Sequence, residues 1–132
     1  FAYLGKRKDG IKEHTIDSYK ADLYLPKTKT IVEVKSIISV SDSAKFPTVY
    51  SERTIKQLNQ INQLLEKGYK VCLMIVSLHP YIKSVMINKK SEFYFQLEKC
   101  LNAGLIIKAY TSRLENFNLS IHKEIEIKYQ GD

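Results

Sequence analysis

The sequence contains no long hydrophobic run, and this absence excludes a transmembrane helix. A helix that crosses a bilayer needs about 20 consecutive apolar residues, whereas the longest apolar stretch here runs from residue 71 to 76. That stretch has the length of a strand. No secretory signal peptide is visible either, so we expect a protein that works in the cytoplasm without a membrane partner.

Cysteine and histidine are scarce, which excludes the usual disulfide and zinc frameworks. Cys72 and Cys100 are the two cysteines, and they lack the close paired spacing of zinc ligands. The three histidines are isolated from one another along the sequence. We therefore predict two reduced core thiols, as is typical of a cytosolic protein, and assign no histidine to a metal.

Repeats, low-complexity segments and linkers are also absent from the 132 residues, a length that is ordinary for one domain. We expect residues 1–132 to form a single domain, with residues 1–10 as a loose basic entry segment. The chain carries 21 Lys plus Arg against 14 Asp plus Glu, a formal charge of +7. This excess favours an anionic partner such as a phosphate backbone, although a basic surface kept for solubility is the alternative.

The hydrophobic pattern predicts an α/β domain with a mixed central β-sheet flanked by helices. Alternating or β-branched segments predict strands, and apolar residues spaced by three and four predict helices. The near-continuous apolar run at 70–78 is typical of a central strand covered on both faces. The polar segment 39–50, which contains Pro47, predicts a loop. The predicted elements are strands 11–16, 19–25 and 30–38, helix 52–67, strand 70–78, helix 91–103, strand 105–111, and a closing hairpin of strands 114–121 and 123–129.

The second and third predicted strands form a hairpin that places two carboxylates opposite each other. A four-residue loop from Pro26 to Lys29 pairs Leu25 with Thr30, and counting back pairs Asp22 with Glu33. Side chains then alternate between two faces of the hairpin. The predicted core face holds Ala21, Leu23, Leu25, Val32 and Val34, and the other face holds Lys20, Asp22, Tyr24, Ile31, Glu33 and Lys35.

The opposed carboxylates indicate a metal site. Their β-carbons would lie about 4.5–5.5 Å apart, where like charges repel, and a divalent cation relieves this because hard metals bind carboxylate oxygens. Lys35 shares a strand face with Glu33, so its ammonium reaches the water or phosphate beside the ion. Such a set suits phosphodiester cleavage, in which the metal lowers the pKa of a bound water and the lysine positions it or neutralises developing charge. The alternative is a solvated face on which Lys20 and Lys35 shield the acids.

Asp22 followed by Glu33-Val34-Lys35, in this order of elements, resembles the PD-(D/E)xK nuclease superfamily. More narrowly, the sequence resembles the nuclease domain of the sugar fermentation stimulation (SfsA) family over roughly residues 11–128. This resemblance implies a restriction-endonuclease-like core. The motifs that carry it are Tyr19-Lys20-Ala21-Asp22, Val32 to Ser36, Phe46-Pro47, Ser51-Glu52-Arg53 with Lys56 and Leu58, Glu66 to Val71, and Ala103-Gly104 before Ala109-Tyr110.

The resemblance implies a nuclease that uses Mg²⁺ or Mn²⁺ to cleave DNA, with RNA as the alternative substrate. Asp22 and Glu33 would bind the metal with the Val34 carbonyl as a third ligand, and Lys35 would orient and activate the attacking water. Glu13 would supply a further acidic group, unless it is simply an exposed strand carboxylate. The helix at 52–67 would border the site, unless its polar side is only a solvated face. The residues expected to contact nucleic acid are Lys20, Tyr24, Arg53, Lys56 and Gln57.

Three positions depart from the family pattern. Lys20 stands where the family usually has arginine, Thr48 where it has aspartate, and Thr54 where it has glycine. These changes bear on substrate contacts more than on metal binding. The family also carries a small OB-like β-barrel domain before its nuclease domain, which we expect to be absent from this chain.

Two rival interpretations compete with a nuclease. One is a non-catalytic DNA-binding or regulatory protein that keeps the nuclease fold, and the other is a structural module of a larger assembly. The complete Asp–Glu–Lys set argues against both, because binding alone does not require a repulsive pair of carboxylates. Many nucleases of this class pair to cut two strands, so the resemblance also allows a homodimer.

Overall fold

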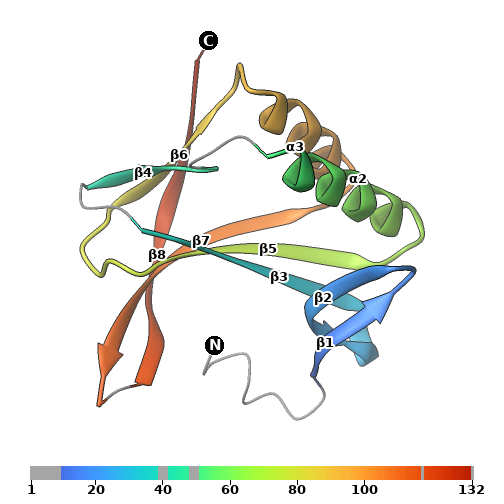
Figure 1. The fold of residues 1–132 in the computed structure, drawn as a ribbon, viewed down its shortest axis with the longest axis horizontal. Coiled ribbons are helices and arrows are strands. Elements are labelled where there is room, and N and C mark those ends of the chain that lie inside the picture. Colours follow the sequence, from blue (N-terminus) through green and yellow to red (C-terminus); the bar gives the residue numbers. More distant parts are fainter. Residues whose placement is uncertain (1–9, 39–41, 48–50, 117, 132) are drawn as a thin grey trace.

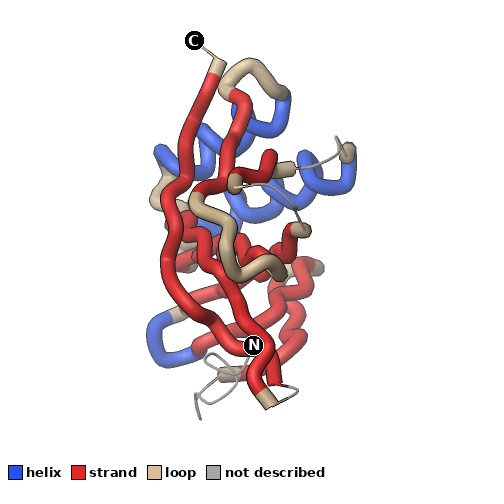
Figure 2. Tube along the Cα trace, turned by 90° about the vertical axis from the view of Figure 1, so that its left-hand side faces the viewer, coloured by secondary structure: helices blue, strands red, loops and turns tan. Residues whose placement is uncertain are grey.

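In the described part of the chain, eight strands form one mixed sheet, and two α-helices pack against it (Figures 1 and 2). The computed structural model describes residues 10–38, 42–47, 51–116 and 118–131. In these segments neither α-helix is long and apolar enough to cross a bilayer. The elements are β1 (Ile11–Ile16), β2 (Tyr19–Leu25), the 3-10 turn η1 (Pro26–Thr28), β3 (Thr30–Ile37), β4 (Ser43–Lys45), α2 (Glu52–Glu66), β5 (Lys70–Ser77), β6 (Ser84–Asn88), α3 (Glu92–Asn102), β7 (Ile106–Glu115) and β8 (Asn118–Gln130).

The strand order is β1-β2-β3-β5-β7-β8-β6-β4. The central strands β3, β5 and β7 run parallel, whereas β1, β2 and β3 pair with one another antiparallel, as do β7 and β8. The long strand β8 pairs with β7 through its first part and with β6, in parallel, through its last part. The prediction of a mixed central sheet flanked by helices is therefore confirmed.

Two hydrophobic clusters lie on opposite faces of the sheet. Both helices contribute to the larger cluster, α2 through Leu58, Ile61 and Leu64 and α3 through Phe93, Leu97 and Cys100. The smaller cluster contains only strand residues, namely Leu23, Leu25, Val32 and Met74. Strand β5 sends alternate side chains to each cluster, so the near-continuous apolar run at 70–78 is the covered central strand that its sequence predicts.

Both helices begin and end within one residue of their predicted bounds, 52–67 and 91–103. The Ser91 hydroxyl accepts a hydrogen bond of 3.1 Å from the backbone N–H of Tyr94 and so caps α3. Ser51 occupies the equivalent position before α2, without a side-chain capping bond. After the helices, Gly68 and Gly104 adopt φ angles of 96° and 109°, a region that L-residues with a Cβ disfavour.

Gly104→Ala is expected to lower the free energy of unfolding by about 1–2 kcal/mol, the usual cost of a left-handed residue that carries a Cβ. A methyl group at this position would meet no atom within 4 Å, so the cost comes from backbone conformation alone. Gly104→Asn should lose less, because asparagine tolerates this region better. Urea unfolding of the three proteins measures the difference. Equal stability of the alanine variant and the wild type would contradict this explanation.

Two stretches of the sheet differ from the sequence prediction. The predicted loop at 39–50 contains the three-residue strand β4, and β6 lies in a stretch for which no element was predicted. These strands pair with each other and β6 pairs with β8, so each is stabilised by distant partners. Strands of this length are too short to show a clear alternating pattern in the sequence. They form because of tertiary contacts with distant strands.

The predicted closing hairpin of strands 114–121 and 123–129 is wrong. Strand β7 continues to Glu115 through a bulge between Thr111 and Ser112, and β8 is one strand of 13 residues. The chain reverses after Asn116, whose φ of 50° is typical of a turn. The bulge interrupts the alternation of β7 at the place where a strand end was predicted.

Candidate active site

The β2–β3 hairpin has the predicted loop and the predicted register. Turn η1 and Lys29, with a φ of 53°, connect the strands, and Leu25 pairs with Thr30 and Leu23 with Val32. The backbone pairing of β2 with β3 ends at Leu23 and Val32. One position further on, Asp22 Oδ2 accepts a hydrogen bond of 2.7 Å from the backbone N–H of Val34. The Asp22 side chain therefore replaces the backbone of β2 as the partner of β3.

The predicted core face is confirmed for Leu23, Leu25, Val32 and Val34, which lie in or against the smaller cluster, but it is wrong for Ala21, and the opposite face is partly buried. Ala21, predicted to share a face with Leu23, lies in the cluster beneath the helices, together with Ile31. Ile31 has 0% exposure and Glu33 has 5%, although both were predicted on the face opposite the core face. Helix α2 covers this part of β3, and a hairpin pattern alone carries no information about a helix that later packs on it.

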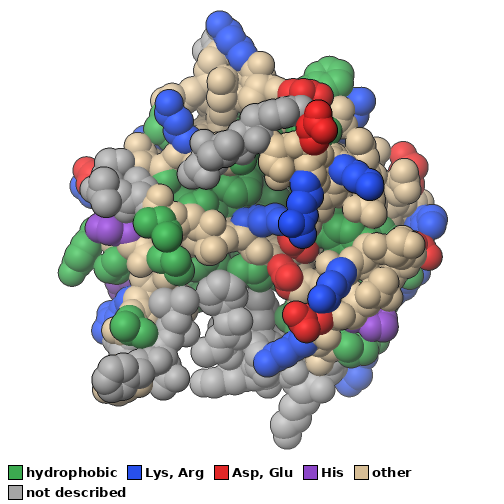
Figure 3. Space-filling model, in the orientation of Figure 1, with side chains coloured by type: hydrophobic (Ala, Val, Ile, Leu, Met, Phe, Trp, Pro, Cys, Tyr) green, Lys and Arg blue, Asp and Glu red, His purple; other side chains and the backbone are tan. Residues whose placement is uncertain are grey.

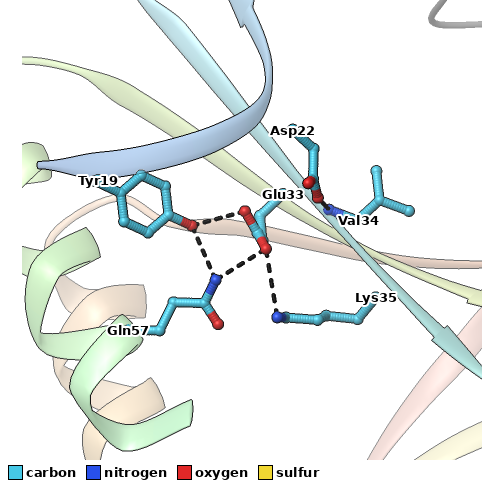
Figure 4. A network of polar contacts seen from close by, with 6 residues as sticks. All are labelled: Tyr19, Asp22, Glu33, Val34, Lys35 and Gln57. Carbon is cyan, nitrogen blue, oxygen red and sulfur yellow. Dashed lines mark hydrogen bonds and ion pairs between the residues drawn. The ribbon is translucent and has the colours of Figure 1, made fainter. Parts of the chain in front are cut away.

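Glu33 is held by three side chains (Figure 4). The Tyr19 hydroxyl donates a hydrogen bond of 2.8 Å to Glu33 Oε2, and Gln57 Nε2 donates one of 2.8 Å to Glu33 Oε1. The same Gln57 nitrogen also donates to the Tyr19 hydroxyl oxygen at 3.3 Å. Lys35 Nζ lies 3.3 Å from Glu33 Oε1. Strands β2 and β3 and helix α2 thus each contribute a side chain to one buried carboxylate.

Burial controls the ionisation of this network. It raises the pKa of the Glu33 carboxyl, the hydrogen bond from Tyr19 opposes the rise, the negative charge of Asp22 adds to it, and the positive charge of Lys35 opposes it. Burial and the Glu33 carboxylate also raise the pKa of Tyr19. The tyrosine therefore keeps its proton and remains a hydrogen-bond donor to Glu33.

Asp22 and the Val34 backbone converge on the same edge of β3. In a strand, the N–H and C=O of one residue point to the same side. Since the Val34 N–H points to Asp22, the Val34 carbonyl also faces the β2 side of the strand. The Asp22 carboxylate and the Val34 carbonyl thus face each other across this edge, and the Asp22 charge acts on Glu33.

The other proposed acidic ligand, Glu13, stands opposite Asp22 in the β1–β2 register, between the pairs Lys12–Leu23 and His14–Ala21. Glu13 is exposed, has a left-handed φ of 53°, and lies 4.0 Å from Lys20 Nζ at Oε1. In the part of the chain that the structure describes, no three His, Cys, Asp or Glu side chains gather closely enough to hold a metal. The role of Glu13 as a further metal ligand therefore stays a prediction.

The five residues predicted to contact nucleic acid differ in exposure and in what they contact. Lys20 on β2 and Arg53 and Lys56 on α2 are exposed. Tyr24 is half-buried and stacks on His14 with ring centroids 5.2 Å apart. Gln57 points at Glu33 rather than into solvent. In Figure 3, Lys and Arg side chains surround acidic side chains where Figure 1 shows the first turns of α2 beside β2 and β3.

Tyr19 is the site residue that sequence reasoning missed. It begins β2 and is 3% exposed, so its position in the strand pattern predicts an ordinary core tyrosine. The Tyr19–Glu33 contact joins residues 14 apart across an irregular part of the hairpin. No sequence signal separates a core tyrosine from one whose hydroxyl reaches a buried acid.

The donor atoms at this place fit one hard divalent cation. Carboxylate and carbonyl oxygens suit Mg²⁺, Mn²⁺ or Ca²⁺, and Asp22, Glu33 and the Val34 carbonyl supply oxygens only. A carboxylate has about four acceptor positions, of which Tyr19, Gln57 and Lys35 occupy at most three on Glu33. A position is therefore left for a metal without breaking the hydrogen bonds from Tyr19 and Gln57.

A family model and two curated relatives identify the same family. The family model described as "Sugar fermentation stimulation protein RE domain" (SfsA) matches residues 2–118. The sugar fermentation stimulation protein homolog of Shewanella woodyi is 28% identical over 106 residues, which cover 78% of this chain and 44% of the relative. The homolog of Aliivibrio salmonicida is 24% identical over 122 residues, which cover 89% of this chain and 51% of the relative. The chain thus spans about half the length of these curated relatives.

A solved structure has a similar fold. The structure of Pyrococcus furiosus SfsA in complex with Ca²⁺ superposes with a TM-score of 0.74 at 18% sequence identity. The match covers 96% of this chain and 59% of that chain. At this identity the similarity establishes the fold alone.

Proposed function

Because the chain belongs to the sugar fermentation stimulation protein (SfsA) family, we propose that it is a metal-dependent nuclease that hydrolyses phosphodiester bonds. DNA is the proposed substrate, and RNA is the alternative. The proposed ion is Mg²⁺ or Mn²⁺. A divalent metal is supported by the oxygen donors of the site and by the Ca²⁺ complex formed by the Pyrococcus furiosus relative.

The observation that carries the proposal is the burial of Glu33 beside a second carboxylate. Glu33 is 5% exposed, and both burial and the Asp22 charge raise its pKa. Keeping such a group charged costs folding free energy. A fold has no structural need for this cost, and Lys35 offsets only one of the two negative charges. A divalent cation between the two carboxylates compensates both.

Each side chain has a defined part in the proposed reaction. Asp22, Glu33 and the Val34 carbonyl would hold the metal, which supplies a Lewis acid and lowers the pKa of a bound water. Lys35 reaches the same place, with Nζ 3.3 Å from Glu33 Oε1, and its ammonium would donate hydrogen bonds to the attacking water or to a phosphate oxygen. Tyr19 and Gln57 keep the Glu33 carboxylate in place through their hydrogen bonds.

The exposed cations of α2 are proposed to hold the phosphate backbone. The double variant Arg53→Ala/Lys56→Ala is expected to weaken DNA binding and to reduce the slope of log K against log salt by about 0.9 per lost phosphate contact. Fluorescence anisotropy with a labelled duplex at several salt concentrations measures both effects. Lys108→Ala, which removes a lysine paired with Glu124 across β7 and β8, is the control. An unchanged slope in the double variant would remove α2 from the proposed interface.

A cleavage panel tests the proposed function. Labelled single- and double-stranded DNA and RNA are incubated with the wild type in Mg²⁺, Mn²⁺ or EDTA, beside Asp22→Asn and Lys35→Ala. The expected result is cleavage that requires metal and is lost in both variants. A folded wild type that binds these nucleic acids but cleaves none of them would favour the rival, a non-catalytic DNA-binding or regulatory protein.

A further inference from the structure

Tyr19 combines a buried ring with a hydroxyl that both donates and accepts a hydrogen bond. Its ring is packed in the larger hydrophobic cluster, and the residue is 3% exposed. Its hydroxyl donates to Glu33 Oε2 at 2.8 Å and accepts from Gln57 Nε2 at 3.3 Å. Gln57 Nε2 also donates to Glu33 Oε1 at 2.8 Å. The three side chains therefore close a triangle of hydrogen bonds (Figure 4).

The directions of these bonds leave little choice for the hydrogens. An amide nitrogen has two hydrogens, and those of Gln57 go to the Tyr19 oxygen and to Glu33 Oε1. The Tyr19 oxygen therefore accepts from Gln57, and its own hydrogen is directed to Glu33 Oε2. The opposite amide orientation would set the Gln57 oxygen against a carboxylate oxygen. Each Glu33 oxygen thus receives its own donor.

We propose that Tyr19 is a positioning residue that, together with Gln57, fixes the plane of the Glu33 carboxylate for a divalent cation. This inference rests on the proposed metal site. A glutamate side chain loses considerable rotamer freedom when it is ordered, and bonds to both oxygens order it before metal arrives. Outer partners of this kind orient metal ligands, and their loss typically lowers metal affinity by 10- to 100-fold.

The network also separates the role of Tyr19 from that of Lys35. Tyr19 and Gln57 bond to Glu33 from the β2 and α2 sides with distances of 2.8 Å, whereas Lys35 Nζ lies at 3.3 Å and is 33% exposed. The partly exposed Lys35 ammonium would be able to turn from Glu33 toward a water or phosphate oxygen beside a bound cation. The neutral donors Tyr19 and Gln57 stay in place, so they set the geometry in which the metal is held.

The test is the affinity of Tyr19→Phe for Mn²⁺, measured by calorimetry without nucleic acid. The change keeps the buried ring and removes only the hydroxyl. We expect the dissociation constant to rise by about 10- to 100-fold. Tyr94→Phe removes another tyrosine–carboxylate hydrogen bond, from Tyr94 to Glu98 on α3, and should leave the affinity unchanged. Circular dichroism checks that both variants are folded.

Two further measurements distinguish the possible outcomes. At saturating Mn²⁺ the cleavage rate of Tyr19→Phe should return toward that of the wild type, because positioning acts on metal affinity. If Tyr19→Phe does not fold, Gln57→Met removes the other donor, with the same expected loss of affinity. A folded variant with wild-type affinity overturns the positioning role, and a wild type that binds no Mn²⁺ overturns the metal site as well. Tight Mn²⁺ binding without cleavage preserves the positioning role and contradicts only the nuclease function.

Discussion

Lys35→Ala is expected to lower the rate of phosphodiester cleavage by about 10²- to 10³-fold, the usual contribution of one hydrogen-bond donor aimed at charge that develops in the transition state. Lys35 Nζ lies 3.3 Å from Glu33 Oε1, so the ammonium is beside the atoms that would bind the metal and its water. Affinity for Mn²⁺ should not fall, because the lysine competes with the metal for Glu33. Single-turnover cleavage at saturating Mn²⁺ isolates the chemical step from binding.

The matched control for this prediction is Lys108→Ala. Lys108 Nζ lies 3.4 Å from Glu124 Oε2. Burial raises the pKa of the Cys72 thiol and the positive charge of Lys108 opposes this rise, and Cys72 packs against the smaller cluster. The loss of Lys108 removes one positive charge from the opposite face of the sheet, so cleavage should be nearly unchanged. Equal rates for Lys35→Ala and the wild type at saturating metal would show that Lys35 takes no part in the chemical step.

Leu97→Ala is expected to lower the free energy of unfolding by about 2–5 kcal/mol, more than Gly104→Ala or Phe95→Ala. Leu97 has 0% exposure and lies on the face of α3 that packs against α2 and the sheet. Truncation removes buried methyl groups and leaves a cavity that the surrounding residues fill only partly. Urea unfolding followed by circular dichroism gives the difference, on the assumption of a two-state transition.

Phe95→Ala is the control on the same helix. Phe95 is 59% exposed and its ring contacts only the Lys99 ammonium among the aromatic interactions of the described residues. Its loss should cost well under half as much as the loss of Leu97, although it removes a larger side chain. A similar cost for both variants would contradict the placement of α3 with Leu97 toward the core.

The sequence predicts much of the fold because several elements are specified locally. Gly68 and Gly104 mark the ends of the two helices, and Ser91 caps α3. The loop from Pro26 to Lys29 sets the register of the β2–β3 hairpin and so places Asp22 near Glu33. Elements stabilised by distant partners, such as β4 and β6, carry no comparable local signal.

The candidate site was predictable in its acids and its lysine but not in its surroundings. Strand alternation places Glu33 and Lys35 on one face, and the turn brings Asp22 across from them. The burial of Glu33 depends on α2, which packs on β3 only after the chain has folded. For the same reason, Gln57 was predicted to contact nucleic acid but bonds to Glu33. Such contacts join α2 to strands that are more than 20 residues away in sequence.

The buried acid also explains why the site stands out physically from the rest of the fold. Most buried positions of the sheet and helices hold apolar side chains, whereas Glu33 is the buried carboxylate among the described residues. Three side chains from three elements satisfy it. This arrangement is costly for stability and is useful when the carboxylate binds a cation.

The most direct test is the rate of cleavage of one labelled oligonucleotide against Mg²⁺ concentration, for the wild type and for Glu33→Gln. The proposed function predicts a rate that rises from zero and saturates with Mg²⁺ in the wild type, and no cleavage by the folded variant across the same range. Cleavage by Glu33→Gln at the wild-type rate, or cleavage by the wild type in EDTA, would contradict it.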